Sequence, residues 1–134
     1  MRQVVVADRT GDTAVTARAL DALFAVRAPL PAELVRRADA ALALREPEAA
    51  AWASRAADAA VDVNDVIRLR KKAIEGFLAA SDMPALGRDL LALAEAAPAG
   101  KDGDDLRNEA LSTAEAARLT AVADAIMAKA AEQF

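Results

Sequence analysis

The sequence predicts an all-α protein, a single domain of five to seven helices in antiparallel hairpins, packed as a bundle or a short solenoid. Alanine, the best helix former, fills about 29% of the 134 positions, several times its ordinary usage. Apolar residues recur with helical spacing along most of the chain, and prolines and glycines separate these periodic segments. The connections between segments are short, which favours antiparallel neighbours.

The N-terminal residues differ from the rest of the chain. Val4, Val5 and Val6 are β-branched and favour extended backbone, and Thr10-Gly11-Asp12 is typical of a turn. We therefore expect residues 1–11 to form an extended N-terminal arm and residues 12–134 to form the helical domain. Because a lone strand cannot satisfy its own backbone, the arm would lie on its own bundle or pair with another chain. The three valines are therefore candidate partner contacts.

Prolines and capping residues set the expected helix boundaries. Pro29 ends the first helix, and Pro31 and Pro47 begin the next two. Asn64 and Asp82 are suitable N-caps for the following two helices. The expected helices span residues 12–27, 31–45, 47–61, 65–80, 84–97 and 104–111, and a last helix runs from residue 112 nearly to Phe134.

Three further features concern the core and the C-terminal part. Residues 98–105 are typical of a loop, and Ser112-Thr113-Ala114-Glu115 is a capping box that predicts the start of the last helix. Phe77 lies on an apolar stripe and should be buried. Trp52 stands among alanines and is expected to fill the core, although tryptophan also anchors interfaces.

Residues 31–61 and 65–97 form two helix–turn–helix units of similar length, which resemble tetratricopeptide hairpins. In Glu46-Pro47-Glu48-Ala49-Ala50 the small residues fall where the second helix of such a repeat packs, and Phe77 falls at an aromatic position of the first helix. An offset of 34 residues does not bring the two units into register, so the resemblance is to helical hairpins in general. It implies a groove that holds a peptide or a helix.

The residues that usually carry catalysis are scarce. Histidine, cysteine and tyrosine are absent, which removes the side chain that titrates near neutral pH, the thiol nucleophile and the thiolate metal site. Ser54, Ser81 and Ser112 have no histidine to act as base, and the five glycines form no phosphate-binding loop. We therefore expect no enzymatic activity, no cofactor, no metal site and no small-molecule substrate.

The overall charge narrows the range of partners. A net charge of −4 and an isoelectric point of about 4.9 disfavour nonspecific binding to nucleic acid or to an anionic membrane. No apolar stretch approaches the roughly 20 residues of a membrane span. The expectation is a soluble protein, cytoplasmic or within a protein assembly.

One concentrated basic patch contains Arg68, Arg70, Lys71 and Lys72. Arg68, Lys71 and Lys72 share one helix face and are candidate contacts for phosphate or for an acidic partner. The alternative, which we favour, is a solvated face on which Arg68 pairs with Asp65 and Lys71 pairs with Glu75.

Three functions are compatible with these features. We expect a structural or assembly subunit of a larger multichain particle, of which a virion or head–tail component is one example, that forms homo- or hetero-oligomers through protein–protein contacts. The alternative is a tetratricopeptide-like adaptor or regulator that binds a peptide or helix. A third possibility is a nucleic-acid accessory protein that uses Arg68, Lys71 and Lys72, although we do not expect nucleic acid as a partner.

Overall fold

The computed structural model describes the backbone of residues 2–132 and the side chains of residues 11–132. Within that part the chain is entirely helical apart from its connections, which confirms the predicted all-α class. Its seven helices are α1 (Arg2–Val26), α2 (Pro31–Ala43), α3 (Ala49–Ala59), α4 (Val63–Ala79), α5 (Met83–Ala96), α6 (Lys101–Ala116) and α7 (Thr120–Ala131).

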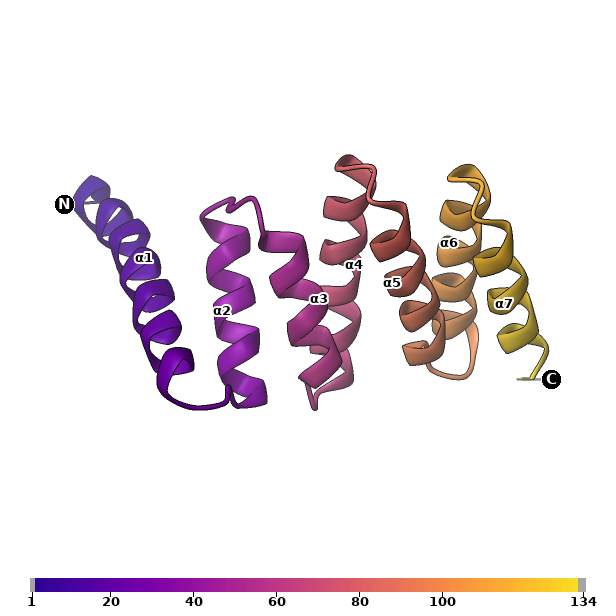
Figure 1. Ribbon diagram of the computed structural model, residues 1–134, viewed down its shortest axis with the longest axis horizontal. Helices are drawn as coiled ribbons and strands as arrows, with labels where there is room; N and C mark the ends of the chain where they lie inside the picture. Colours follow the sequence, from indigo (N-terminus) through magenta and orange to yellow (C-terminus); the bar gives the residue numbers. More distant parts are fainter. Residues whose placement is uncertain (1, 133–134) are drawn as a thin grey trace.

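The helices stand side by side in one open row (Figure 1). After α1 they form three hairpins, α2–α3, α4–α5 and α6–α7, joined by short connections. Each helix packs mainly against the helix before it and the helix after it, and α5 also packs against α7. Packing between sequence neighbours is typical of a short solenoid, whereas the helices of a closed bundle would return to pack on one another.

Each hairpin turns at a residue with left-handed backbone. These residues are Arg45, Ser81 and Arg118, with φ values of 54°, 57° and 62°, and they lie 36 and 37 residues apart. Each sits in a Schellman motif, in which the next N–H donates to the carbonyl five residues earlier. The three bonds are Glu46 to Ala41, Asp82 to Phe77, and Leu119 to Ala114.

The spacing of 36 and 37 residues between the hairpin turns places buried positions of successive hairpins in register. Ala53, Asp89 and Ile126 occupy equivalent places in α3, α5 and α7, and all three are buried. Arg70 and Arg107 are equivalent in α4 and α6, and both are buried. The structure therefore contains a structural repeat of 36–37 residues in which burial recurs at both sets of positions, whereas residue type recurs only at the two arginines.

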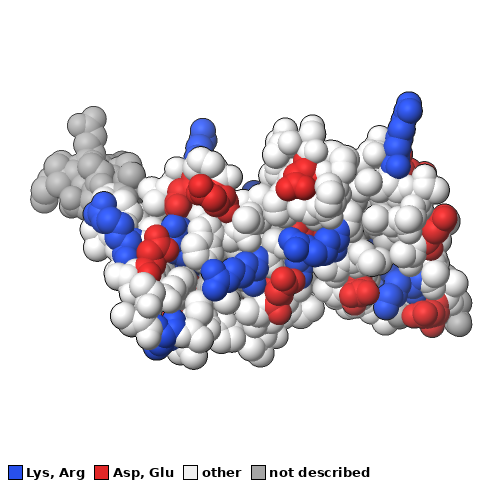
Figure 2. Space-filling view, viewed as in Figure 1, with Lys and Arg blue, Asp and Glu red and all other residues white. Residues whose placement is uncertain are grey.

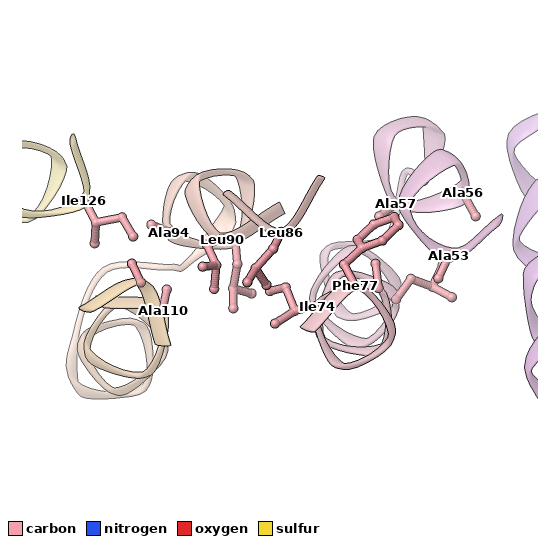
Figure 3. Packing of buried hydrophobic residues seen from close by; sticks show 14 of the residues in the cluster. Ala53, Ala56, Ala57, Ile74, Phe77, Leu86, Leu90, Ala94, Ala110 and Ile126 are labelled. Carbon is pink, nitrogen blue, oxygen red and sulfur yellow. The ribbon is translucent and has the colours of Figure 1, made fainter. Parts of the chain in front are cut away.

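The core runs along the row between two layers of helices. In Figure 3, Ile74 of α4 and Ala110 of α6 lie on one side, and Leu86, Leu90 and Ile126 of α5 and α7 lie on the other. Phe77 is buried beside the small residues of α3, as its place on the apolar stripe predicts. Alanine at the buried positions of α3 lets the helices approach closely.

The extended arm predicted over residues 1–11 stays a prediction. Gly11 lies inside α1 (Arg2–Val26), where the sequence predicts a turn between an extended arm and the first helix. The side chains of Val4, Val5 and Val6 are outside the described residues, so their contacts stay a prediction.

The C-terminal part also requires a correction. Helix α6 (Lys101–Ala116) takes up residues 101–105 of the predicted loop over 98–105, and the Ser112–Glu115 segment lies within it. The hydroxyl of Thr113 donates to the carbonyl of Glu109 at 3.0 Å, so it does not cap a helix. At the other end of α6, a Cβ on Gly103 would lie 1.4 Å from the carbonyl oxygen of Pro98, so glycine permits this close turn.

Two other helix starts can be compared with the predicted caps. Asp82 accepts a hydrogen bond from the backbone N–H of Ala85, as expected of an N-cap. For α4 the cap is Asp62, whose carboxylate accepts from the N–H of Asn64 at 2.8 Å. Asn64 was the predicted cap, but it lies within the first turn because Val63 is already helical.

Candidate functional site

The basic patch lies on α4, the helix in the middle of the row. Arg68 reaches across to α2, with Nη1 2.6 Å from Oδ1 of Asp39, and a second nitrogen lies 3.2 Å from Asp65. The hydrogen bond that Arg68 donates to Asp39 raises the pKa of Arg68 above its ordinary value. The predicted Asp65–Arg68 ion pair is present. The ion pair between Arg68 and Asp39 joins two neighbouring hairpins.

Lys71 and Lys72 have looser partners. Nζ of Lys71 lies 3.7 Å from Glu109 of α6, and Nζ of Lys72 lies 3.7 Å from Glu75. The predicted pairing of Lys71 with Glu75 is therefore replaced by one that spans two hairpins. Both separations exceed ordinary hydrogen-bond length. On the face seen in Figure 2, charges of both signs are interspersed, which favours the solvated-face interpretation.

Arg70 does not belong to this surface patch. It is 4% exposed, and it binds Asp89 and Asp58, the latter at 2.7 Å. Ser54 donates to Asp89 at 2.9 Å, so the network joins α3, α4 and α5. Burial lowers the pKa of Arg70, and the hydrogen bonds to the two aspartates outweigh it, so the net pKa is raised. This network holds neighbouring hairpins together.

Arg37 and Arg107 are buried in the same way in α2 and α6. Arg37 binds Asp21 of α1 at 2.7 Å and Glu46 at 2.8 Å. Arg107 donates to the carbonyls of Ala97 and Pro98, each at 3.2 Å. In each hairpin, therefore, a buried arginine of the first helix binds residues that precede that helix in the chain.

The sequence contained one signal for this role. Arg70 lies three and four residues before Ala73 and Ile74, which in turn lie four and three residues before Phe77 on its apolar stripe. A charged residue on the core face of a helix needs a buried partner. The partner cannot be read from the sequence, since Asp89 lies on another helix.

Trp52 packs where α1 meets α3. Its ring centroid lies 6.1 Å from that of Phe24, at a tilted angle. The guanidinium carbons of Arg37 and Arg55 lie 4.7 and 5.3 Å from the tryptophan ring, within the range of cation–π attraction. The side chain is partly buried against the core, so it joins α1 to the first hairpin.

A groove of about 300 Å³ lies between α4 and α6, and we call it the α4–α6 groove. It exists because α5 packs against both helices and holds them apart. Its volume is at the lower limit of small-molecule pockets, which suits one large side chain better than an organic cofactor. The lining residues are Ile74 and Leu78 of α4, Leu90 and Leu93 of α5, Ala110 and Thr113 of α6, and the charged Lys71, Glu75 and Glu109.

The groove combines an apolar floor with a charged rim. Leu78 is 46% exposed at its edge, whereas Leu90 and Leu93 are buried beneath it. Lys71 and Glu109 face each other across it at 3.7 Å. Sequence reasoning identified Lys71 as a candidate contact but missed the leucines, because the groove forms only when two hairpins stack.

Among the side chains that the structure describes, no three histidine, cysteine or acidic residues gather where they could hold a metal ion. None of the helices, as far as they are described, is long and apolar enough to cross a membrane. No protein-family model, no curated protein and no solved structure matches this chain.

Proposed function

We propose that the protein is a non-enzymatic adaptor that binds an amphipathic helix of a partner protein in the α4–α6 groove. The observation that carries this proposal is the exposed Leu78 beside an apolar floor, between two helices that stand apart. Grooves of this kind accept the apolar face of a helix. Stacked helical hairpins commonly present such extended binding surfaces.

The groove supplies affinity and orientation through different residues. Covering Leu78 and filling the space above Leu90 and Leu93 would contribute about 1.5–3 kcal/mol for each large apolar side chain buried. The ammonium of Lys71 and the carboxylate of Glu109 are partly exposed and loosely paired. Charges at a rim set the direction and specificity of a bound helix more than its affinity.

A displayed library of amphipathic helical peptides tests this proposal. Peptides selected on the whole chain should shift the amide resonances of Leu78 and Thr113 when they bind. Leu78→Glu should abolish this binding by placing a charge on the apolar edge. Val63→Glu is the matched control, because Val63 lies on the same helix, is similarly exposed and does not line the groove. Equal binding to both variants, or no enriched peptide, would contradict the proposal.

The second candidate function is an assembly subunit. The observation that favours it is the exposure of large apolar residues on the two end helices, Val15 and Val26 on α1 and Met127 on α7. Repeat arrays need a polar outer face on their terminal units to stay separate. Apolar end faces therefore favour contacts with other chains.

A further inference from the structure

The outer face of α1 carries an apolar stripe that nothing in the described part of the chain covers. We call it the N-terminal stripe; it consists of Val15, Ala19, Ala22 and Val26, all exposed. Val15 is 55% exposed and Val26 is 79% exposed. The spacing of four, three and four residues is that of a helix seam that packs against another helix. The other face of the same helix already packs against α2.

At the opposite end of the row, α7 is apolar on nearly every side. Of its twelve residues only Thr120, Asp124 and Lys129 are polar. A helix that is apolar all round is normally buried on more than one side. Here Ala123 and Ile126 are buried, whereas Met127 is 48% exposed.

The repeat shows what normally covers the position of Met127. With the period of 36 and 37 residues, Met127 is equivalent to Leu90 in α5 and Ser54 in α3. Leu90 is 1% exposed and Ser54 is 2% exposed. Leu90 is buried at the floor between α4 and α6, so the helix of the next hairpin contributes to its burial. Among residues 2–132, no helix occupies the equivalent place next to α7.

Charges on the two ends are complementary. Arg18 is exposed next to Ala19 of the N-terminal stripe, and Asp124 is exposed one turn before Met127. Neither makes an ion pair with any residue that the structure describes. An arginine on one end and an aspartate on the other can pair when the ends meet.

We propose that copies of this chain stack end to end, with the N-terminal stripe of one copy packed on the outer face of α7 of the next. The junction packs a helix of one copy against a helix of the next, as neighbouring hairpins do within one chain. It is heterologous, so it produces a row of copies or a closed ring. One helix face is small compared with a standard interface of about 1,600 Å², so the association is weak and depends on concentration.

Sedimentation velocity of the full chain tests this association over a range from about 10 μM to about 1 mM. The sedimentation coefficient should rise with concentration. Val15→Glu and Met127→Glu should each abolish the rise, while Val61→Glu should leave it unchanged. Val61 is a fair control because it is 90% exposed and lies between α3 and α4, away from both ends. Circular dichroism checks that each variant keeps its helix content.

Mixing the two end variants tests the direction of the contact. Val15→Glu retains an intact α7 face, and Met127→Glu retains an intact N-terminal stripe. Their mixture should form a discrete dimer and nothing larger, since only one junction remains. A dimer of Met127→Glu alone would show that α1 pairs with itself, and a dimer of Val15→Glu alone would show that α7 does. Either result, or a monomer at every concentration, would overturn the proposal.

A charge exchange gives an independent test. Arg18→Asp and Asp124→Arg should each weaken self-association about tenfold or less, and the double variant should recover it. If the double variant recovers no association, the proposed ion pair between Arg18 and Asp124 is contradicted. Peptide binding in the α4–α6 groove does not involve either end, so stacking and adaptor function can fail separately.

Discussion

Gly76 of α4 lies directly against Ala50 of α3, so that a Cβ added at Gly76 would stand 2.6 Å from the Cβ of Ala50. Real Cβ atoms do not approach so closely, and neither atom belongs to a flexible side chain that could move aside. The distance between the two helices therefore depends on glycine at this position.

Gly76→Ala should lower the free energy of unfolding, although alanine is the better helix former. Overpacking typically costs about 1–3 kcal/mol, against a gain in helix propensity of about 1 kcal/mol. Gly11→Ala is the matched control, because Gly11 is helical and has no atom within 4 Å of its added Cβ. Urea unfolding should show destabilisation only for Gly76→Ala. Equal stabilisation of both variants would mean that the helices can separate freely.

Phe77→Ala should destabilise the fold by about 3–5 kcal/mol, because Phe77 is buried against α3. Lys72→Ala should change the stability by less than about 0.5 kcal/mol, since its ion pair is long and exposed. Urea unfolding of both variants gives the comparison. A small effect of Phe77→Ala would show that the core relaxes around the lost ring.

Asp89→Ala should be strongly destabilising, by about 3–5 kcal/mol, because it removes a partner of the buried Arg70 guanidinium. The double variant Arg70→Met, Asp89→Leu should recover much of this loss. Arg70 Nε and Asp89 Oδ2 have no hydrogen-bond partner in the wild-type network, so apolar replacements leave fewer buried polar atoms unsatisfied. A double-mutant cycle in urea measures the coupling, and additive losses would contradict it.

Acid should weaken the link between α2 and the chain that follows it. The hydrogen bond from Arg37 lowers the pKa of Glu46 from its ordinary value of 4.5. A carboxylate whose pKa is lowered by folding contributes stability above its unfolded pKa, and this contribution is lost as the pH falls through the folded pKa. The free energy of unfolding should therefore fall below pH 4.5, and Glu46→Gln should reduce the dependence. Identical pH profiles for wild type and variant would exclude this residue as a contributor.

Two of the three helix boundaries that prolines were expected to set were predictable, whereas α3 begins at Ala49, two residues after the predicted start at Pro47. Pro31 begins α2, and the break after Val26 precedes Pro29, because proline removes a donor and clashes with the preceding turn. The boundary at Arg118 was not predictable, since arginine gives no sign of left-handed backbone and the nearby Ser112–Glu115 segment looks like a helix start. Turn chemistry that does not use glycine or asparagine leaves little trace in a sequence.

The site could be predicted only in part. Arg68 and Lys71 were recognisable as an exposed basic face, because they share one side of a periodic helix. The partners Asp39 and Glu109 lie 29 and 38 positions away along the chain, on other hairpins, and depend on how these stack. The repeat itself was hidden because equivalent positions hold residues as different as Ala53, Asp89 and Ile126.

The neighbour-only packing of the row has a consequence for how the molecule opens. Helix α4 is covered by α3 and α5 and is tied by Arg68 and Lys71 to the hairpins on both sides, whereas α1 packs mainly on α2. Local opening in such an array begins where a unit has fewest neighbours. Amide hydrogens of α4 should therefore exchange with solvent slowest and those of α1 fastest, so that fraying advances from the extremities toward the centre.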